Sequence, residues 1–138
     1  MCLECPRTDR FLGGTHLKIP HAQMSMNQIP IFGGNLARIE SKKVNRIVAE
    51  MAPLNMTTRK HDLMWLGYDD TDNEGYHLDK DREYPGYANW GTNEQGAALP
   101  DNVFDSNGNG QDCVAINYRG LTLWDDHFCY ERMNFKFN

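Results

Sequence analysis

The chain has 138 residues, enough for one domain with one hydrophobic core, and we treat residues 1–138 as a single domain. Acidic side chains outnumber basic ones by 19 to 14, which gives a formal net charge of -5. This balance argues against nucleic acid as a partner, because phosphate binding needs a basic surface, and no apolar run is long enough to cross a membrane as a helix.

The first half of the chain predicts helix. Proline and glycine interrupt residues 1–32, although about Ala22–Gln28 is compatible with a short helix. The clearest helix is predicted over Leu36–Met51, with Ser41 as a plausible N-cap and Pro53 as the stop. Its apolar residues recur at helical spacing, at Val44, Ile47, Val48 and Met51.

The second half predicts short strands. Apolar runs and alternating patterns mark them, at Met64–Gly67, Tyr76–Leu78, Cys113–Tyr118, Leu121–Trp124 and Tyr130–Phe137. Between them, residues 79–112 form a long irregular region rich in acids, glycine and asparagine, a composition typical of functional loops. A helix followed by strands predicts an α+β fold.

The four cysteines allow three full pairings. Cys2 and Cys5 form a C-x-x-C motif, but a four-cysteine zinc site needs a second such pair, and Cys113 and Cys129 are too widely spaced for one. We favour a disulfide between Cys113 and Cys129, which implies an oxidising compartment. The sequon at Asn55 agrees with a secreted glycoprotein.

No catalytic motif is readable in the sequence. The five histidines include no H-E-x-x-H, no G-x-S-x-G occurs, and Cys113 has no local base. We therefore expect a binding protein and not an enzyme.

Three segments are rich in the carboxylates and amides that Ca²⁺ prefers as ligands. Their members are Asp69, Asp70, Asp72 and Glu74, then Asp101, Asn102, Asp105, Asn107, Asn109, Gln111 and Asp112, and then Asp125 and Asp126. Composition alone is equally compatible with acidic loops that keep the protein soluble. The run from Asp105 to Gly110 begins like an EF-hand loop, but Ile116 stands where the bidentate Glu would be, so we interpret it as turn chemistry.

Several motifs in one order resemble the C-type lectin domain family over about residues 30–137. They are Trp65-Leu66-Gly67, Glu74-Gly75, Tyr87-Ala88-Asn89-Trp90, Asp112-Cys113-Val114 and Leu123-Trp124-Asp125-Asp126, followed by Cys129. Upstream, Gly33–Ser41 resembles the start of the family's second helix, whereas residues 1–30 form a divergent N-terminal segment.

The resemblance implies the family's fold, with two helices, two small antiparallel sheets and a long calcium-binding loop region. It also implies the bridge between Cys113 and Cys129. Ile29 and Phe137 stand where the family has another disulfide, so we expect an apolar contact there. Cys2 and Cys5 are expected to pair with each other or with another chain.

The resemblance implies two groups of site residues. The sugar and calcium site would use Asp101, Gln111, Asp125 and Asp126, with Pro100 as the family's cis-proline. Leu99 offers no side-chain oxygen at the first ligand position, so Glu94 is an alternative ligand there. Phe104 is either a sugar-stacking ring or an aromatic anchor of the core or the loop. A second calcium site would use Asp70, Glu74, Asn102 and Asp112, with Gln111 shared.

The function implied is that of a secreted, calcium-dependent, carbohydrate-binding lectin. The Pro100-Asp101 order resembles the galactose and N-acetylgalactosamine type. The alternative is a lectin-like module without sugar binding that contacts protein, mineral or ice, or forms part of an assembly. Leu99 favours this alternative, and Cys2 and Cys5 favour an oligomer.

Overall fold

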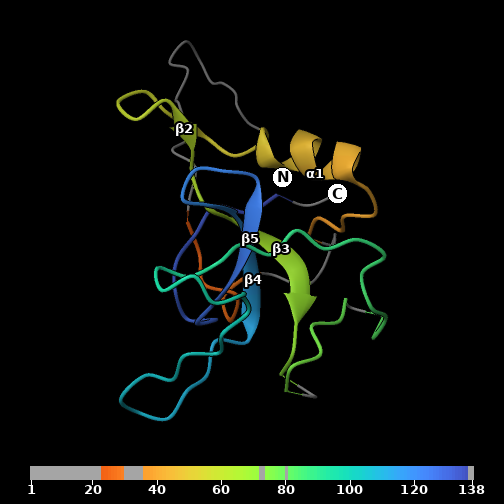
Figure 1. The fold of residues 1–138 in the computed structure, drawn as a ribbon, viewed down its shortest axis with the longest axis vertical. Coiled ribbons are helices and arrows are strands. Elements are labelled where there is room, and N and C mark those ends of the chain that lie inside the picture. Colours follow the sequence, from red (N-terminus) through yellow and green to blue (C-terminus); the bar gives the residue numbers. More distant parts are fainter. Residues whose placement is uncertain (1–22, 30–35, 72–73, 80, 137–138) are drawn as a thin grey trace, which may run out of the picture.

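The computed structural model describes residues 23–29, 36–71, 74–79 and 81–136 (Figure 1). Along the chain lie α1 (Lys42–Ala49), β1 (Leu54–Asn55), β2 (Lys60–His61), β3 (Met64–Asp69), β4 (Cys113–Tyr118) and β5 (Leu123–His127). β1 and β2 form a two-stranded antiparallel sheet, and β3, β4 and β5 form a three-stranded antiparallel sheet in that order. These elements confirm the predicted α+β class.

The helix α1 begins later than predicted. Ser41 is its N-cap, as expected, because its Oγ accepts a hydrogen bond of 3.2 Å from the backbone amide of Val44. The predicted start at Leu36 is wrong, because the backbone before Ser41 bonds to β3 instead of forming a helical turn. The carbonyl of Ala37 accepts a 2.9 Å hydrogen bond from the amide of Gly67. Tertiary partners here outweigh local helix propensity.

The two segments predicted as a first helix and a last strand form isolated pairings instead. Met24 and Met133 exchange backbone hydrogen bonds of 3.0 and 3.1 Å, and a turn follows in which the amide of Gln28 donates to the carbonyl of Ser25. No helix therefore forms over the described residues 23–28. Of the predicted strand Tyr130–Phe137, the bridged residues are Met133 and Asn134, while Phe137 lies outside the described residues.

The remaining strand predictions differ in their bounds. Of Tyr76–Leu78, only Leu78 makes a bridge, to Asp69. β5 starts at Leu123, because Leu121 lies in a turn in which its backbone amide donates a hydrogen bond to the carbonyl of Tyr118. The β1–β2 hairpin was not predicted. Its turn is held by Asn55, whose Oδ1 accepts hydrogen bonds from the backbone amides of Thr57 and Thr58.

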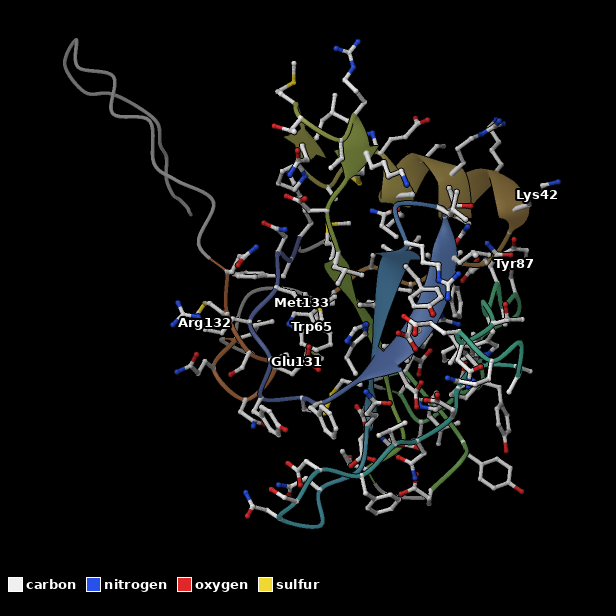
Figure 2. The ribbon with its side chains drawn as sticks, turned by 60° about the vertical axis from the view of Figure 1, so that its left-hand side comes forward. Lys42, Trp65, Tyr87, Glu131, Arg132 and Met133 are labelled. Carbon is white, nitrogen blue, oxygen red and sulfur yellow. A yellow bond between two sulfur atoms is a disulfide. The ribbon has the colours of Figure 1, made fainter. Side chains whose placement is uncertain are left out.

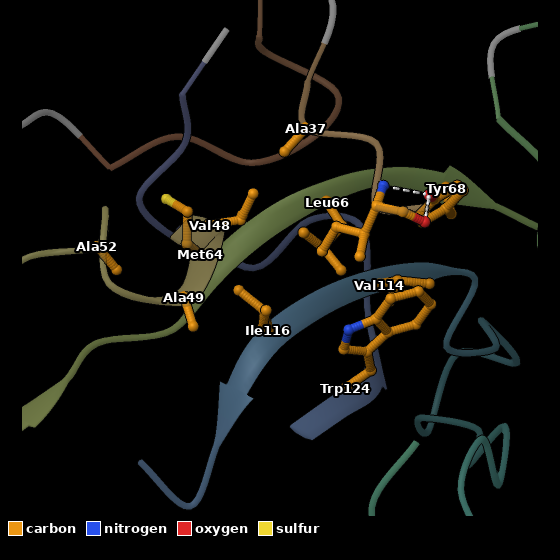
Figure 3. Close-up of a cluster of buried hydrophobic side chains, with 11 residues drawn as sticks. Ala37, Val48, Ala49, Ala52, Met64, Leu66, Tyr68, Val114, Ile116 and Trp124 are labelled. Atoms are coloured by element: carbon orange, nitrogen blue, oxygen red, sulfur yellow. Dashed lines mark hydrogen bonds between the residues drawn. The ribbon is translucent and has the colours of Figure 1, made fainter. Parts of the chain in front are cut away.

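Apolar side chains pack on both faces of the large sheet, as the two-residue period of a strand requires. One cluster lies between the sheet and α1 and includes Met64, Leu66, Tyr68, Val114, Ile116 and Trp124 (Figure 3). The indole nitrogen of Trp124 donates a buried 2.7 Å hydrogen bond to Oδ1 of Asn45. Such a bond satisfies both polar groups inside the core.

The second cluster lies on the opposite face, around Trp65. This side chain lies beside Met133 (Figure 2), and its indole nitrogen donates to the carbonyl of Met24. The disulfide between Cys113 and Cys129 is confirmed and borders this cluster. Ile29 is buried in the same cluster, but its expected partner and the remaining two cysteines lie outside the described residues.

The strand register brings the acidic segments to one end of the sheet. Asp69 pairs with Cys113, and Cys113 pairs with His127, so β3 and β5 end where β4 begins. The helix lies at the other end, where the side chain of Asn117 donates to the carbonyl of Ala49 (Figure 1). None of the helices in the described ranges is long and apolar enough to cross a membrane.

Candidate cation-binding site

Two groups of three acidic residues lie at the end of the sheet remote from α1. Asp101, Asp125 and Asp126 form the first, here termed the Asp126 group. Asp70, Glu74 and Asp112 form the second, here termed the Asp70 group. In each group, one carboxylate oxygen per residue lies within 4.8 Å of the others. Such a concentration of negative charge is stabilised by a proton or a cation.

Asp126 organises the Asp126 group. It is fully buried, and its two carboxylate oxygens accept hydrogen bonds from the backbone amides of Asp101, at 3.2 Å, and Asn102, at 2.6 Å. Burial raises the pKa of Asp126 to about 6, although these two bonds oppose the shift. The peptide bond between Leu99 and Pro100, directly before Asp101 in the chain, is cis, as predicted.

Asp125 is held by an ionic contact that the sequence analysis missed. Its Oδ2 lies 3.3 Å from Nε2 of His127, whose Nδ1 lies 3.4 Å from Oε1 of Glu131. Burial lowers the pKa of His127, but the two carboxylates outweigh it and raise the value to about 9. The signal was present in the sequence, because alternate residues of a strand share a face and place His127 beside Asp125.

The predicted amide ligands both support the loop before β4. Oδ1 of Asn102 accepts a 2.9 Å hydrogen bond from the amide of Gln111, and Oε1 of Gln111 accepts a 3.2 Å bond from the amide of Val103. An amide oxygen has a second lone pair, so this bonding is compatible with cation binding. Their role as ligands stays a prediction.

The first ligand position of the sugar and calcium site is not filled by a carboxylate in this structure. Leu99 is 4% exposed and belongs to the core. Glu94 is exposed in a turn closed by Asn93 and Ala97, and among the described acids it is not a member of the Asp126 group. Asn93, which the sequence analysis did not single out, places its Nδ2 3.4 Å from Oδ2 of Asp101.

Phe104 is 60% exposed, so its ring is accessible to a ligand. An exposed aromatic ring is the type of side chain that stacks on the apolar face of a sugar. This exposure does not agree with a ring buried in the core, and the choice between sugar stacking and loop anchoring stays a prediction.

The Asp70 group contains buried carboxylate oxygens without hydrogen-bond partners. Asp70 is 2% exposed, and its Oδ2 accepts a 2.8 Å hydrogen bond from the amide of Gly75. Its Oδ1, like Oδ1 of Asp112, is buried and makes no hydrogen bond to any described residue. Burial raises the pKa of both carboxyl groups. Unpartnered, closely spaced oxygens are suited to a divalent cation, which neutralises their charge.

Comparison with known proteins agrees with this geometry. The family described as Lectin C-type domain matches residues 30–135. Lectin BRA-3 from Megabalanus rosa is 29% identical over 104 residues, which are 75% of this chain and 54% of that protein. The chain thus spans about half the length of this relative.

Solved structures share the fold. The carbohydrate-recognition domain of the human scavenger receptor C-type lectin is 26% identical, with a TM-score of 0.56, and the match covers 76% of this chain and 74% of that one. A calcium-independent type II antifreeze protein is 16% identical, with a TM-score of 0.63 over 83% of this chain and 78% of that one. The second match, at its low identity, bears on the fold alone.

Proposed function

This chain belongs to the C-type lectin domain family, and on that premise we propose that it is an extracellular protein that binds carbohydrate in a calcium-dependent way. The observation that carries the proposal is the Asp126 group, in which Asp101 follows a cis-proline and Asp125 and Asp126 belong to β5. Calcium binds six to eight oxygen ligands and leaves positions for waters or hydroxyl groups. The described carboxylates would hold the ion and accept hydrogen bonds from sugar hydroxyls.

We further propose galactose or N-acetylgalactosamine as the sugar. The order of Pro100 and Asp101 resembles the galactose-type triplet of the family. Phe104 follows three residues after Asp101, and its exposed ring would stack on the sugar. Binding at one site is expected to be weak, because hydroxyl groups exchange bonds with water for bonds with protein at little net gain. Several sites on one assembly would then supply avidity, for which Cys2 and Cys5 are candidate links.

An extracellular location is supported by the disulfide between Cys113 and Cys129, since such bonds persist in oxidising compartments. The sequon residue Asn55 is exposed at the β1–β2 turn, which is compatible with a glycan. We propose a secreted glycoprotein with a binding function and no enzymatic one.

The second candidate function is a lectin-like module that binds protein, mineral or ice without a sugar. It is favoured by Leu99, which is buried in the position where a calcium ligand would be expected. The similarity in fold to a calcium-independent antifreeze protein is compatible with it.

A galactose-agarose column separates the two candidates. We expect retention in Ca²⁺, elution by EDTA, and loss of retention in Asp101→Ala and Asp126→Ala. Glu50→Ala, an exposed acid at the end of α1, is the matched control and should be retained like the parent protein. Glu94→Ala tests the alternative first ligand.

Retention that survives EDTA, or that both aspartate substitutions leave intact, excludes the Asp126 group as the sugar site. No retention on galactose or on a panel of other immobilised sugars favours the second candidate function.

A further inference from the structure

A pair of stacked aromatic rings lies at the surface just after β5. The rings of Phe128 and Tyr130 are parallel to within 7°, with centroids 5.2 Å apart. Tyr130 is nevertheless 49% exposed, because Phe128 covers only one face of its ring. Such rings are enriched where proteins bind their partners, since an exposed aromatic face is apolar surface in contact with water. Core packing does not explain a ring that is half exposed.

The backbone holds this stack in one arrangement. Cys129, between the two rings in the chain, is fixed to β4 by its disulfide with Cys113. Glu131 closes the turn, because its amide donates a 3.0 Å hydrogen bond to the carbonyl of Phe128 and its Oε2 accepts a 3.1 Å bond from the amide of Phe128. A ring that is already ordered loses little conformational entropy when a ligand binds to it. The exposed face of Tyr130 is therefore a preorganised surface.

The hydroxyl of Tyr130 joins the stack to the long loop before β4. It donates a 2.8 Å hydrogen bond to Oδ2 of Asp105. Oδ1 of Asp105 accepts bonds of 2.9 Å from the backbone amides of Asn107 and Asn109, so the same side chain also closes its own loop. The neighbouring residue Phe104 is 60% exposed. Two exposed aromatic rings thus belong to the segments that this bond joins.

The stack lies beside the Asp126 group. The loop and β5 are in contact at the 2.6 Å bond from the amide of Asn102 to Oδ2 of Asp126. The two segments meet again at the bond between Asp105 and Tyr130. Three residues of chain span at most about 11 Å, so the Cα of Asp105 lies no further than this from that of Asn102. The loop projects beyond the end of the sheet that carries the acidic groups (Figure 1). The face of Tyr130 is therefore within reach of an oligosaccharide that starts at the Asp126 group.

We propose that Tyr130 forms a second sugar subsite, which stacks on a later unit of a galactose-terminated oligosaccharide. The C–H groups on one face of a sugar ring would pack on the exposed aromatic face, while the hydroxyl groups stay in water. The inference rests on the proposed function, since it needs the terminal galactose to be held by the Asp126 group. It assigns Tyr130 no part in calcium binding, and Phe104 stays the candidate ring for the terminal unit.

The test compares two ligands in Ca²⁺ by isothermal titration. One is methyl β-galactoside, which fills only the first subsite, and the other is a galactose-terminated tetrasaccharide. We expect the parent protein to bind the tetrasaccharide roughly 3–10-fold more tightly, the gain that one stacked aromatic contact supplies. Tyr130→Ala should make the two affinities nearly equal. Tyr76→Ala, the control, removes a ring that is 47% exposed in the segment after β3, and should keep the affinity ratio of the parent protein.

Tyr130→Phe separates stacking from support of the loop. It keeps the ring and removes the bond to Asp105, so it should retain the affinity ratio of the parent protein. Loss of the ratio in Tyr130→Phe, or its persistence in Tyr130→Ala, would overturn the subsite. Equal binding of both ligands by the parent protein would overturn the subsite and leave the proposed function intact, whereas binding of neither ligand would overturn both.

A second readout keeps the proposal testable if Tyr130→Ala does not fold. In the parent protein saturated with Ca²⁺ and tetrasaccharide, nuclear Overhauser effects should connect the ring protons of Tyr130 to a sugar unit beyond the terminal galactose. Their absence at saturation would overturn the proposal.

Discussion

The backbone amide of Asn102 donates a 2.6 Å hydrogen bond to Oδ2 of Asp126, 24 residues further along the chain. The same carboxylate is a candidate calcium ligand, so it serves the loop and the site together. Substitutions that remove the carboxylate should affect both stability and calcium binding, whereas loss of a more exposed ligand should affect calcium binding alone.

Asp126→Ala tests this double role. It leaves the amides of Asp101 and Asn102 without acceptors, so we expect the free energy of unfolding in EDTA to fall by about 1–3 kcal/mol. Asp101→Ala is the matched control, because the carboxylate of Asp101 contacts Asn93 at an exposed position and holds no backbone amide. Urea denaturation measures the stabilities. Equal stability of Asp126→Ala and the parent protein would contradict the role of this carboxylate in the loop.

Removal of bound cations should lower the melting temperature. A ligand at a hundredfold excess over its Kd stabilises the folded state by about 2.7 kcal/mol. We expect EDTA to lower the melting temperature by several degrees, and Ca²⁺ to restore it more fully than Mg²⁺. Differential scanning calorimetry measures the shift, and Asp101→Ala should respond less to Ca²⁺. A melting curve that EDTA does not change would mean that the acids serve solubility only.

Tyr68→Phe should destabilise the core. The hydroxyl of Tyr68 accepts a 2.7 Å hydrogen bond from the buried amide of Ile39 and donates to its carbonyl (Figure 3). Its loss leaves that amide unpaired, so we expect the free energy of unfolding to fall by about 1–3 kcal/mol. Tyr76→Phe is the control, since Tyr76 is 47% exposed, and should change stability by less than about 0.5 kcal/mol. Equal urea midpoints for the two variants would refute this assignment.

Loss of the disulfide between Cys113 and Cys129 should destabilise the fold through the unfolded state. The bond closes a loop with a sequence separation of 16, for which chain entropy predicts about 3 kcal/mol. The double variant Cys113→Ala/Cys129→Ala should show this loss in non-reducing urea denaturation. Mass spectrometry of a non-reduced digest should recover the two cysteines in one linked peptide pair. Detection of either as a free thiol in folded protein would count against the bond.

Asp105 should titrate below the ordinary range of an aspartate. Hydrogen bonds from the backbone and side chain of Asn109 lower its pKa to about 2, and Tyr130 adds a smaller effect in the same direction. Because the folded pKa lies below the unfolded value, the stabilisation is present above about pH 4 and is lost as the pH falls towards 2. Carboxyl NMR titration measures the pKa, which Asn109→Ala should raise. A pKa at or above 3.8 in the parent protein would contradict these bonds.

The sequence by itself determined the features that depend on local pattern. Alternation and apolar runs located the central strands β3 and β4, because these signals act between neighbouring residues. The hydroxyl of Ser41 identified the N-cap of α1, although the helix was predicted to begin earlier, at Leu36. The order of family motifs indicated the bridge from Cys113 to Cys129 and the cis bond before Pro100.

Only the tertiary structure decided which acids meet and what surrounds them. The register that aligns Asp69, Cys113 and His127 brings together carboxylates far apart along the chain, and no local propensity encodes that convergence. The same holds for His77, which looks like an ordinary loop histidine until the bridge between Asp69 and Leu78 places it beside Asp70. Burial lowers the pKa of His77, an effect that depends on the folded environment and not on the neighbouring sequence.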